Sequence, residues 1–354
     1  MTVINSLAQE VLDNWQVRKH RSQKTAFIQF LQSRIPEAKG EQGGISRSRN
    51  IIVGDVDTAK VVFTAHYDTC ARLPLPNMLF PENLLLSLLY SLVFVIPAVL
   101  VGILVATLVD AMAGFLTFMG VLVLVVVLMM GPIPNPHTVN DNTSGVVTLL
   151  ELYGQLTPEE RGRCCLVFFD NEENGLLGSS VFAGKHRSAM KDKLLVNFDC
   201  VSDGDVLRLI ANGRARRHYG RALQQALPAD EAAKAGKDMA LGSDLKVFYP
   251  SDQMVFPCSV GCAAFVRHPV LGPYVRRIHT ARDTIFDEAD VQCMVSFARR
   301  LLAELCSGDP AAEEPEPEAK GAKAKRVLTV VAILLVCAAV GGVIGWLLAS
   351  SMWG

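Results

Sequence analysis

The feature that most constrains this chain is a long apolar stretch between residues 84 and 130, in which Asp110 is the only charged residue. As one α-helix this stretch would be about 70 Å long, whereas the hydrocarbon core of a bilayer is about 30 Å thick. Two helices that reverse near Asp110 fit this thickness, so we predict a transmembrane hairpin with helices at about 84–108 and 112–130. The alternative is a helical hairpin buried in a soluble core. The mean hydropathy of +0.29 favours the membrane, because it is high for an ordinary soluble enzyme.

A second apolar segment, residues 327–349, contains no charged residue. It follows residues 308–326, whose prolines and charges are typical of a flexible linker. Lysine and arginine gather between residues 320 and 326, and such residues flank membrane helices on the cytoplasmic side. We therefore expect an integral protein of the inner or plasma membrane, whose hairpin enters and leaves the bilayer on the cytoplasmic side. Its main domain would face the cytoplasm.

Cysteine usage and net charge narrow the cellular setting. The nine cysteines are odd in number and show no CxxC spacing, which favours a reducing compartment over a disulfide framework. The net charge of -1 gives no sign of a nucleic-acid surface. The apolar segments lead us to expect a lipid bilayer as a partner of the chain, and the net charge leads us to expect no nucleic acid.

Outside the apolar segments, strand-like runs alternate with helical patterns. This alternation predicts an α/β fold with a mostly parallel or mixed central sheet and helices on both faces. The domain would comprise residues 1–78 and 134–307, with residues 79–133 inserted as the hairpin segment. Residues 1–35 show apolar positions at helical spacing and predict one amphipathic helix. The other runs are strand-like at 60–69, 163–174, 193–199 and 261–266, and helical at 140–156, 175–186 and 287–305.

Charged residues stand at the ends of these apolar strands, and sites in open α/β sheets lie outside the carboxyl ends of the strands. Taken singly, a histidine or a glutamate pair at a strand end is more often structural. The placement of all these residues at strand ends is what indicates a functional site. Imidazole and carboxylate groups, with no cysteine near these motifs, suit zinc at a catalytic site. Two metal ions sharing one carboxylate would use five such residues as ligands, leaving one base and one orienting residue. The seven residues are His66, Asp68, Asp141, Glu172, Glu173, Asp199 and His279.

The motifs HYDT, NDNTSG, FFDNEENGLLGS, NFD and HTARDT together resemble the di-zinc aminopeptidase family. That family includes bacterial leucyl aminopeptidases, glutamate carboxypeptidase and transferrin-receptor-like proteins. The resemblance covers about residues 50–78 and 134–305, and it implies a zinc-exopeptidase-like fold. His66 and Asp141 are 75 residues apart, and removing residues 79–133 leaves 20. The hairpin is therefore expected to be an insertion into the loop after the first ligand strand.

The resemblance implies a metal role for five of the residues. His66 and Asp199 would bind one zinc ion. Glu173 and His279 would bind a second, and Asp141 would bridge the two. Other divalent metals, such as cobalt or manganese, can occupy the same ligands.

The same resemblance implies supporting roles. Glu172 would be the general base, which takes a proton from a metal-bound water and passes it to the leaving amine. Asp68 would orient His66 through its second ring nitrogen, and Asp283 would support the loop that carries His279. Relatives often have a cis peptide after the bridging aspartate, so the bond from Asp141 to Asn142 is a candidate.

Substrate contacts are less closely matched. Relatives commonly carry a Ser-Asp-His stretch on the substrate side, whereas residues 251–253 here are SDQ. Gln253 can donate a hydrogen bond but cannot carry a positive charge. Tyr249 is a candidate oxyanion donor, with a purely structural role as the alternative.

The expected function is that of a membrane-anchored zinc aminopeptidase, a metallo-exopeptidase. Its substrates would be peptides with a free N-terminus, some of them membrane-associated. The alternatives are a glutaminyl-cyclase-like acyltransferase and a non-catalytic membrane adaptor on a peptidase fold. A transporter is disfavoured, because three spans are few and Asp110 lies at the expected turn of the hairpin. The hairpin itself could select membrane-bound substrates or simply anchor the enzyme.

Overall fold

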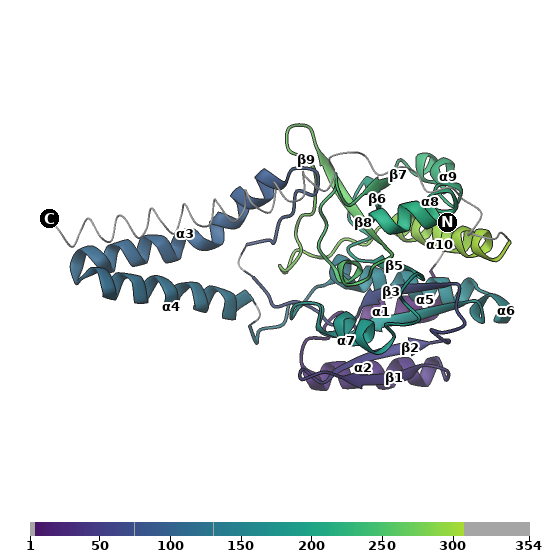
Figure 1. Cartoon of the computed structure of the whole chain (residues 1–354). Coiled ribbons are helices and arrows are strands. Elements are labelled where there is room, and N and C mark those ends of the chain that lie inside the picture. The colour runs from purple at the N-terminus through teal and green to yellow at the C-terminus, as the bar shows by residue number, and fades with distance from the viewer. Residues whose placement is uncertain (1–3, 74, 130, 308–354) are drawn as a thin grey trace. The chain divides into compact units, whose positions relative to one another are not determined.

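The computed structural model describes residues 4–73, 75–129 and 131–307 (Figure 1). The described residues fall into two compact units, one formed by residues 4–83 and 131–307 and the other by residues 84–129. The predicted linker at 308–326 and the predicted C-terminal span at 327–349 lie outside the described residues.

The larger unit is built on a nine-stranded mixed sheet, in the order β1-β2-β4-β3-β5-β8-β6-β7, with β9 paired to β8. Strands β4, β3, β5 and β8 are parallel to one another, whereas β2 is antiparallel to β4 and β6 is antiparallel to β8. The predicted α/β class with a mixed central sheet is confirmed. The strands are β1 Lys39–Gly43, β2 Ser48–Val53, β3 Val61–His66, β4 Cys164–Phe169, β5 Leu194–Phe198, β6 Val206–Ala211, β7 Asp238–Ser243, β8 Ser259–His268 and β9 Gly272–Tyr274.

Successive strand residues point to opposite faces of the sheet. Both faces carry apolar side chains, and helices cover both of them. Val61 and Phe63 of β3 pack with apolar residues of α1, α5 and α10, whereas Val62 joins a second cluster with Phe182 of α7. Both faces of the central strands are thus buried and apolar, as a covered sheet requires. The helices of this unit are α1 Ser6–Asn14, α2 Arg21–Arg34, α5 Ser144–Gln155, α6 Pro158–Arg161, α7 Leu177–Lys185, α8 Gly213–Gln225, α9 Ala229–Lys234 and α10 Glu288–Ser307.

The N-terminal segment forms two helices, α1 and α2, so the expectation of one amphipathic helix over residues 1–35 is wrong. The chain leaves the helical path around Arg18, which is fully buried. Its main-chain N–H donates to Thr69 Oγ1 (2.9 Å), and its guanidinium Nε donates to the carbonyl of Tyr67 (2.5 Å). These bonds hold the interhelical segment against the chain that follows β3.

The smaller unit consists of α3 (Leu84–Leu108) and α4 (Ala111–Met129), which run antiparallel side by side (Figure 1). The helices pack closely at Gly102 and Gly114, where a Cβ added to Gly114 would lie 2.7 Å from the carbonyl oxygen of Gly102. Among the described residues, α3 alone is long and apolar enough to cross a membrane. The apolar part of α4, Ala111–Val125, is shorter, so a second membrane span stays a prediction.

Candidate metal centre

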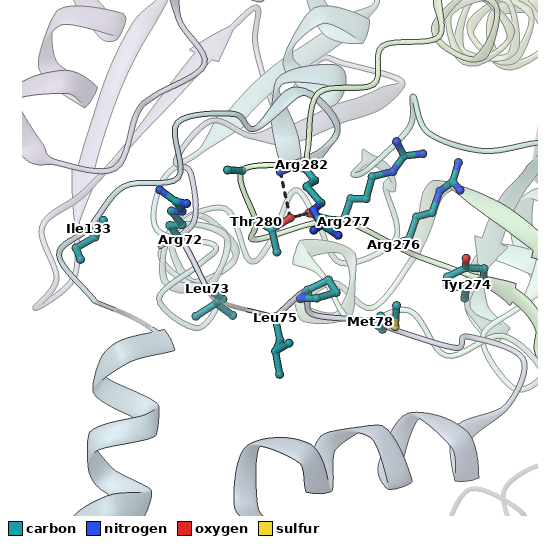
Figure 2. Close-up of a pocket in the computed structure, with 12 residues that line it drawn as sticks. Arg72, Leu73, Leu75, Met78, Ile133, Tyr274, Arg276, Arg277, Thr280 and Arg282 are labelled. Atoms are coloured by element: carbon teal, nitrogen blue, oxygen red, sulfur yellow. Dashed lines mark hydrogen bonds between the residues drawn. The ribbon is translucent and has the colours of Figure 1, made fainter. Parts of the chain in front are cut away.

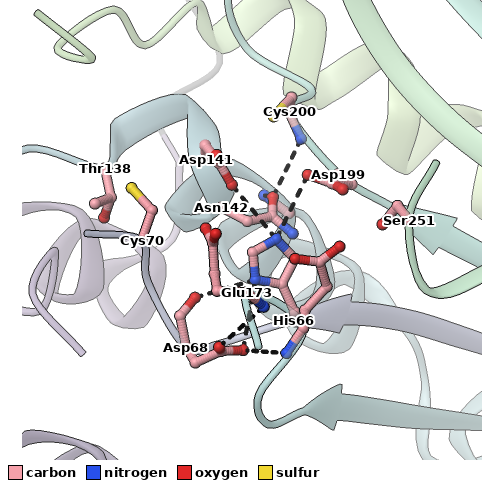
Figure 3. A network of polar contacts seen from close by, with 12 residues as sticks. His66, Asp68, Cys70, Thr138, Asp141, Asn142, Glu173, Asp199, Cys200 and Ser251 are labelled. Carbon is pink, nitrogen blue, oxygen red and sulfur yellow. Dashed lines mark hydrogen bonds and ion pairs between the residues drawn. The ribbon is translucent and has the colours of Figure 1, made fainter. Parts of the chain in front are cut away.

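His66 and Asp199 are brought together by neighbouring parallel strands. His66 is the last residue of β3, and Asp199 directly follows β5, which pairs with β3 in parallel. The carboxyl ends of both strands therefore lie at the same edge of the sheet. His66 Nε2 lies 3.5 Å from Asp199 Oδ1 and 3.5 Å from Asp141 Oδ1 (Figure 3). All three side chains are almost fully buried.

Asp141 lies in a tight turn, Val139–Thr143, directly before α5. The peptide bond between Asp141 and Asn142 is cis, as predicted. The backbone N–H groups of Asn140 and Asp141 donate to the two carboxylate oxygens of Asp283, at 2.8 and 3.0 Å. Asn142 Nδ2 donates to the carbonyl of Phe198, at the end of β5 (2.9 Å). Asp283, which is predicted to support the His279 loop, thus bonds directly to the turn that carries Asp141.

Glu172 and Glu173 follow β4, the neighbour of β3 on its other side. Their backbone N–H groups donate to the carboxylate of Asp68, at 3.0 and 3.3 Å. Asp68 is predicted to orient His66, and the closest contact uses its main chain. The carbonyl oxygen of Asp68 lies 3.0 Å from His66 Nδ1, and the carboxylate oxygen Oδ1 lies 3.7 Å away. A carbonyl only accepts, so Nδ1 carries the proton and Nε2 faces the cluster.

His279 comes from a loop after β9 and has a left-handed backbone conformation, with φ of 62°. Its Nε2 lies 3.1 Å from Asp141 Oδ2 and 3.5 Å from Glu173 Oε2. The carbonyl of His279 accepts the N–H of Leu73 (2.7 Å), which ties this loop to the chain that follows β3. Asp141 therefore faces one histidine through each of its carboxylate oxygens.

The expectation that no cysteine lies near the metal motifs is wrong. Cys70 is fully buried, and its Sγ belongs to a group of ligand atoms with Asp141, Glu173 and His279, all within 4.8 Å of one another. Cys70 follows His66 by only four residues, and the chain beyond β3 passes the same edge of the sheet. That proximity in the sequence was the signal available.

The two predicted substrate contacts make hydrogen bonds within the protein. The hydroxyl of Tyr249 donates to the main-chain carbonyl of Asp199 (3.2 Å), and both side chains are buried. Gln253 Nε2 donates to the carbonyl of Tyr249 (2.7 Å), and its Oε1 accepts from Asn197 Nδ2 (3.1 Å). Sequence reasoning also passed over Asp252, which is fully buried and whose pKa burial raises to about 7.

Burial opposes ionisation of the glutamates in this cluster, and a bound cation would offset that cost. Burial raises the pKa of Glu173 to about 8 and the pKa of Glu172 well above its usual range. Burial acts to lower the pKa of His279, but Glu173 and Asp141 raise it to about 9. For Asp141 burial acts to raise the pKa, and His279 and His66 outweigh it, so the pKa lies below its usual range. The carboxylates thus stabilise positive charge on whatever lies between them.

The residues present fit a metal ion. His66 Nε2, Asp199 Oδ1 and Glu173 Oε1 are buried and have no hydrogen-bond partner among the described residues. An unpaired buried polar atom costs about 1–3 kcal/mol, so three of them in one cluster call for a ligand. Imidazole nitrogens with carboxylate oxygens are donors that zinc accepts. Two groups of ligand atoms share Asp141, one with His66 and Asp199 and the other with Glu173 and His279.

A separate cavity of about 910 Å³ lies against the His279 loop (Figure 2). Its lining includes the apolar side chains of Leu73, Leu75, Met78 and Ile133, together with four arginines. Arg276 and Arg277 both contact Asp203, at 3.4 and 3.1 Å. The cavity therefore combines guanidinium groups, two of them paired with Asp203, with apolar surface. The arginines are Arg72, Arg276, Arg277 and Arg282.

Comparison with solved structures supports the fold. No curated protein matches the chain. LapA of Legionella pneumophila superposes with a TM-score of 0.51 at 12% identity, over 86% of this chain and 74% of LapA. The glutaminyl cyclase of Tannerella forsythia gives a TM-score of 0.51 at 13% identity, over 87% of this chain and 100% of the cyclase. That of Porphyromonas gingivalis gives 0.50 at 15% identity, over 84% and 96%. At such identities these likenesses show the fold alone.

A family match goes further than these likenesses. Residues 123–303, just over half of the chain, match peptidase family M28. The matched range spans Asp141, the two glutamates after β4, Asp199 and His279, whereas His66 precedes it. From this match the chain belongs to peptidase family M28.

Proposed function

We propose that this chain is a membrane-anchored zinc aminopeptidase, which hydrolyses the N-terminal peptide bond of peptide substrates. The observation that carries the proposal is the pair of ligand groups that share Asp141. One contains His66 and Asp199, and the other contains Glu173 and His279. A shared carboxylate between two such groups suits two metal ions, and co-catalytic pairs of this kind serve peptide hydrolysis. Membership of a peptidase family supports the same reaction class.

Zinc held by these residues would polarise the scissile carbonyl and favour ionisation of the attacking water. The chain's own residues then handle the proton. Glu172 has a carboxylate oxygen within 4.8 Å of ligand atoms of His66 and Glu173, so it reaches both halves of the cluster. We assign to Glu172 the role of general base, which takes a proton from the water and gives it to the leaving amine. The Asp68 carboxylate accepts the backbone N–H of Glu172 and thereby positions the main chain that carries the Glu172 side chain.

We propose that α3 and α4 anchor the enzyme in a lipid bilayer, with the α/β unit on the cytoplasmic side. α3 has 25 residues, and only 11% of its most apolar window is buried. A helix buried in a soluble core would be covered by other protein atoms, whereas this helix presents its apolar side chains outward. Lipid is the environment that suits such a surface.

The test of catalysis compares the purified full chain with Glu172→Gln, using amino-acyl-p-nitroanilides and a determination of bound zinc. We expect the substitution to lower kcat by about 10²–10⁴-fold, because one general base is worth that much, while bound zinc is unchanged. Glu159→Gln, at an exposed glutamate, is the matched control and should keep full activity. Loss of zinc together with activity would remove the assignment of Glu172 as base.

A glutaminyl-cyclase-like reaction is the second candidate, because two of the solved structures that resemble this fold are glutaminyl cyclases. An N-terminal glutamine peptide distinguishes the two reactions. The aminopeptidase releases free glutamine, whereas a cyclase yields a pyroglutamyl peptide and ammonia. Pyroglutamyl product with no released amino acid would replace the proposed function.

A further inference from the structure

Cys70 is held in a fixed position beside the cluster. Its carbonyl accepts the main-chain N–H of Asn135 (3.2 Å), and the side-chain Nδ2 of Asn135 lies 3.7 Å from Cys70 Sγ. Asn135 Nδ2 also donates to the carbonyls of His137 (2.5 Å) and Thr280 (2.9 Å). Cys70 and Asn135 are both fully buried. The thiol is thus oriented by an amide that is itself anchored to the loop next to His279.

The two groups that share Asp141 differ in the number of ligand atoms. The first contains three, from His66, Asp141 and Asp199, whereas the second contains four, because Cys70 joins Asp141, Glu173 and His279. Figure 3 shows Cys70 beside Asp141 and Glu173. A second observation also indicates a ligand in this group. Glu173 Oε1 is buried and has no hydrogen-bond partner among the described residues, and the Glu173 side chain is only 8% exposed.

We propose that Cys70 is the fourth protein ligand of the metal ion held by Asp141, Glu173 and His279. This inference rests on the proposed metal centre. Four protein ligands are typical of closed zinc sites, whereas three leave a position for water or substrate. When the ion binds, Cys70 Sγ gives up its proton to solvent and the sulfur lone pair forms the bond to the metal.

The proposal makes the two halves of the centre unequal. The half with Cys70 is closed by protein and holds its ion more tightly, and the half with His66 and Asp199 keeps an open position for the reacting groups. A thiolate also favours zinc or cadmium over manganese or magnesium, which prefer oxygen ligands. Selectivity for soft metals should therefore belong to the Cys70 half alone.

The experiment is zinc X-ray absorption spectroscopy on the full chain in detergent, with zinc counted on the same samples. We expect a sulfur shell at about 2.3 Å, amounting to about one sulfur for two zinc ions. Cys70→Ser should remove that shell. Cys200→Ser is the matched control, because it removes a buried thiol next to Asp199 that belongs to neither group of ligand atoms, and it should leave the shell unchanged.

Each outcome decides a different point. Two zinc ions without a sulfur shell in the unaltered chain would overturn the role of Cys70 and leave the proposed metal centre in place. A chain that binds no zinc would overturn both. Because the unaltered chain already gives the decisive spectrum, the result does not depend on whether Cys70→Ser folds. Cobalt-loaded protein gives a second readout, since a thiolate ligand adds charge-transfer absorption in the near ultraviolet that Cys70→Ser should lose.

Discussion

The α/β unit buries carboxylates and imidazoles around Asp141, whereas the unit formed by α3 and α4 leaves most of its large apolar side chains exposed. Soluble proteins ordinarily do the reverse in both respects. Buried charge is tolerated when a counter-ion is present, and exposed apolar surface is tolerated when the surroundings are not water. Each exception therefore indicates a partner, a cation in one unit and lipid in the other.

The two units also differ in how precisely the residues that face the partner are held in place. In the α/β unit each ligand is held by named hydrogen bonds, such as those from the Asp141 turn to Asp283. In the other unit the apolar surface is general, and a close contact at Gly102 and Gly114 fixes the spacing of the two helices locally. Substitutions should therefore have large, position-dependent effects around the metal centre and small effects on most of the hairpin.

The largest effect is expected from Asp141→Asn, which changes the one residue that both ligand groups share. Neither half keeps a complete set of anionic ligands, so bound zinc should fall towards zero and activity with it. Zinc per chain, measured by mass spectrometry after gel filtration, checks this outcome. Asp192→Asn, at a distant aspartate on the surface, should retain zinc. If Asp141→Asn kept zinc in one half and lost it in the other, the ligand groups would not share this carboxylate.

A smaller effect is expected from Asp68→Asn. Asp68 touches no metal, but its carboxylate accepts the N–H groups of Glu172 and Glu173 while its carbonyl bonds to His66. An amide offers one acceptor oxygen where the carboxylate offers two, so the glutamate loop is held less firmly. Losses of this kind are typically about 10–100-fold in metal affinity or activity. Zinc titration against a competing chelator measures the change.

The control for Asp68→Asn is Asp57→Asn, since Asp57 is exposed and lies in the loop before β3, at the other end of that strand from His66. Equal zinc affinity in the two variants would mean that Asp68 does not position the loop. In that case the metal ligands of the α/β unit would be positioned by fewer contacts than the hydrogen bonds indicate.

Sequence patterns predicted one part of the site better than another. His66 and Asp199 lie at the ends of apolar strands that pair in parallel, and the strand period and the sheet rule place them together without any other knowledge. His279 and Asp283 lie in loops, and only the resemblance to a family indicated them. Cys70 was missed because the zinc site was expected from imidazole and carboxylate groups alone, although Cys70 follows His66 by only four residues.

The fold shows the same division. The central parallel strands β3, β4, β5 and β8 are continuous apolar runs, so composition alone locates them. The outer strands were not foreseen. β1 is mostly exposed and contains two glycines, and β7 mixes buried and exposed positions, so neither has a clear apolar pattern. The break between α1 and α2 depends on Arg18, whose partners are about 50 residues further along the chain.

The smallest effect is expected in the hairpin, from Gly114→Leu. A side chain at this position meets the carbonyl of Gly102 and the backbone of Ala106, so α3 and α4 must separate. Overpacking of this kind costs about 1–3 kcal/mol, and we expect a lower melting temperature for the detergent-solubilised chain with little change in zinc content. Gly120→Leu is the matched control, because an added Cβ at Gly120 in the same helix meets no atom within 4 Å. Equal melting temperatures for the two variants would show that the helices are held by the surrounding lipid or detergent and not by their own contact.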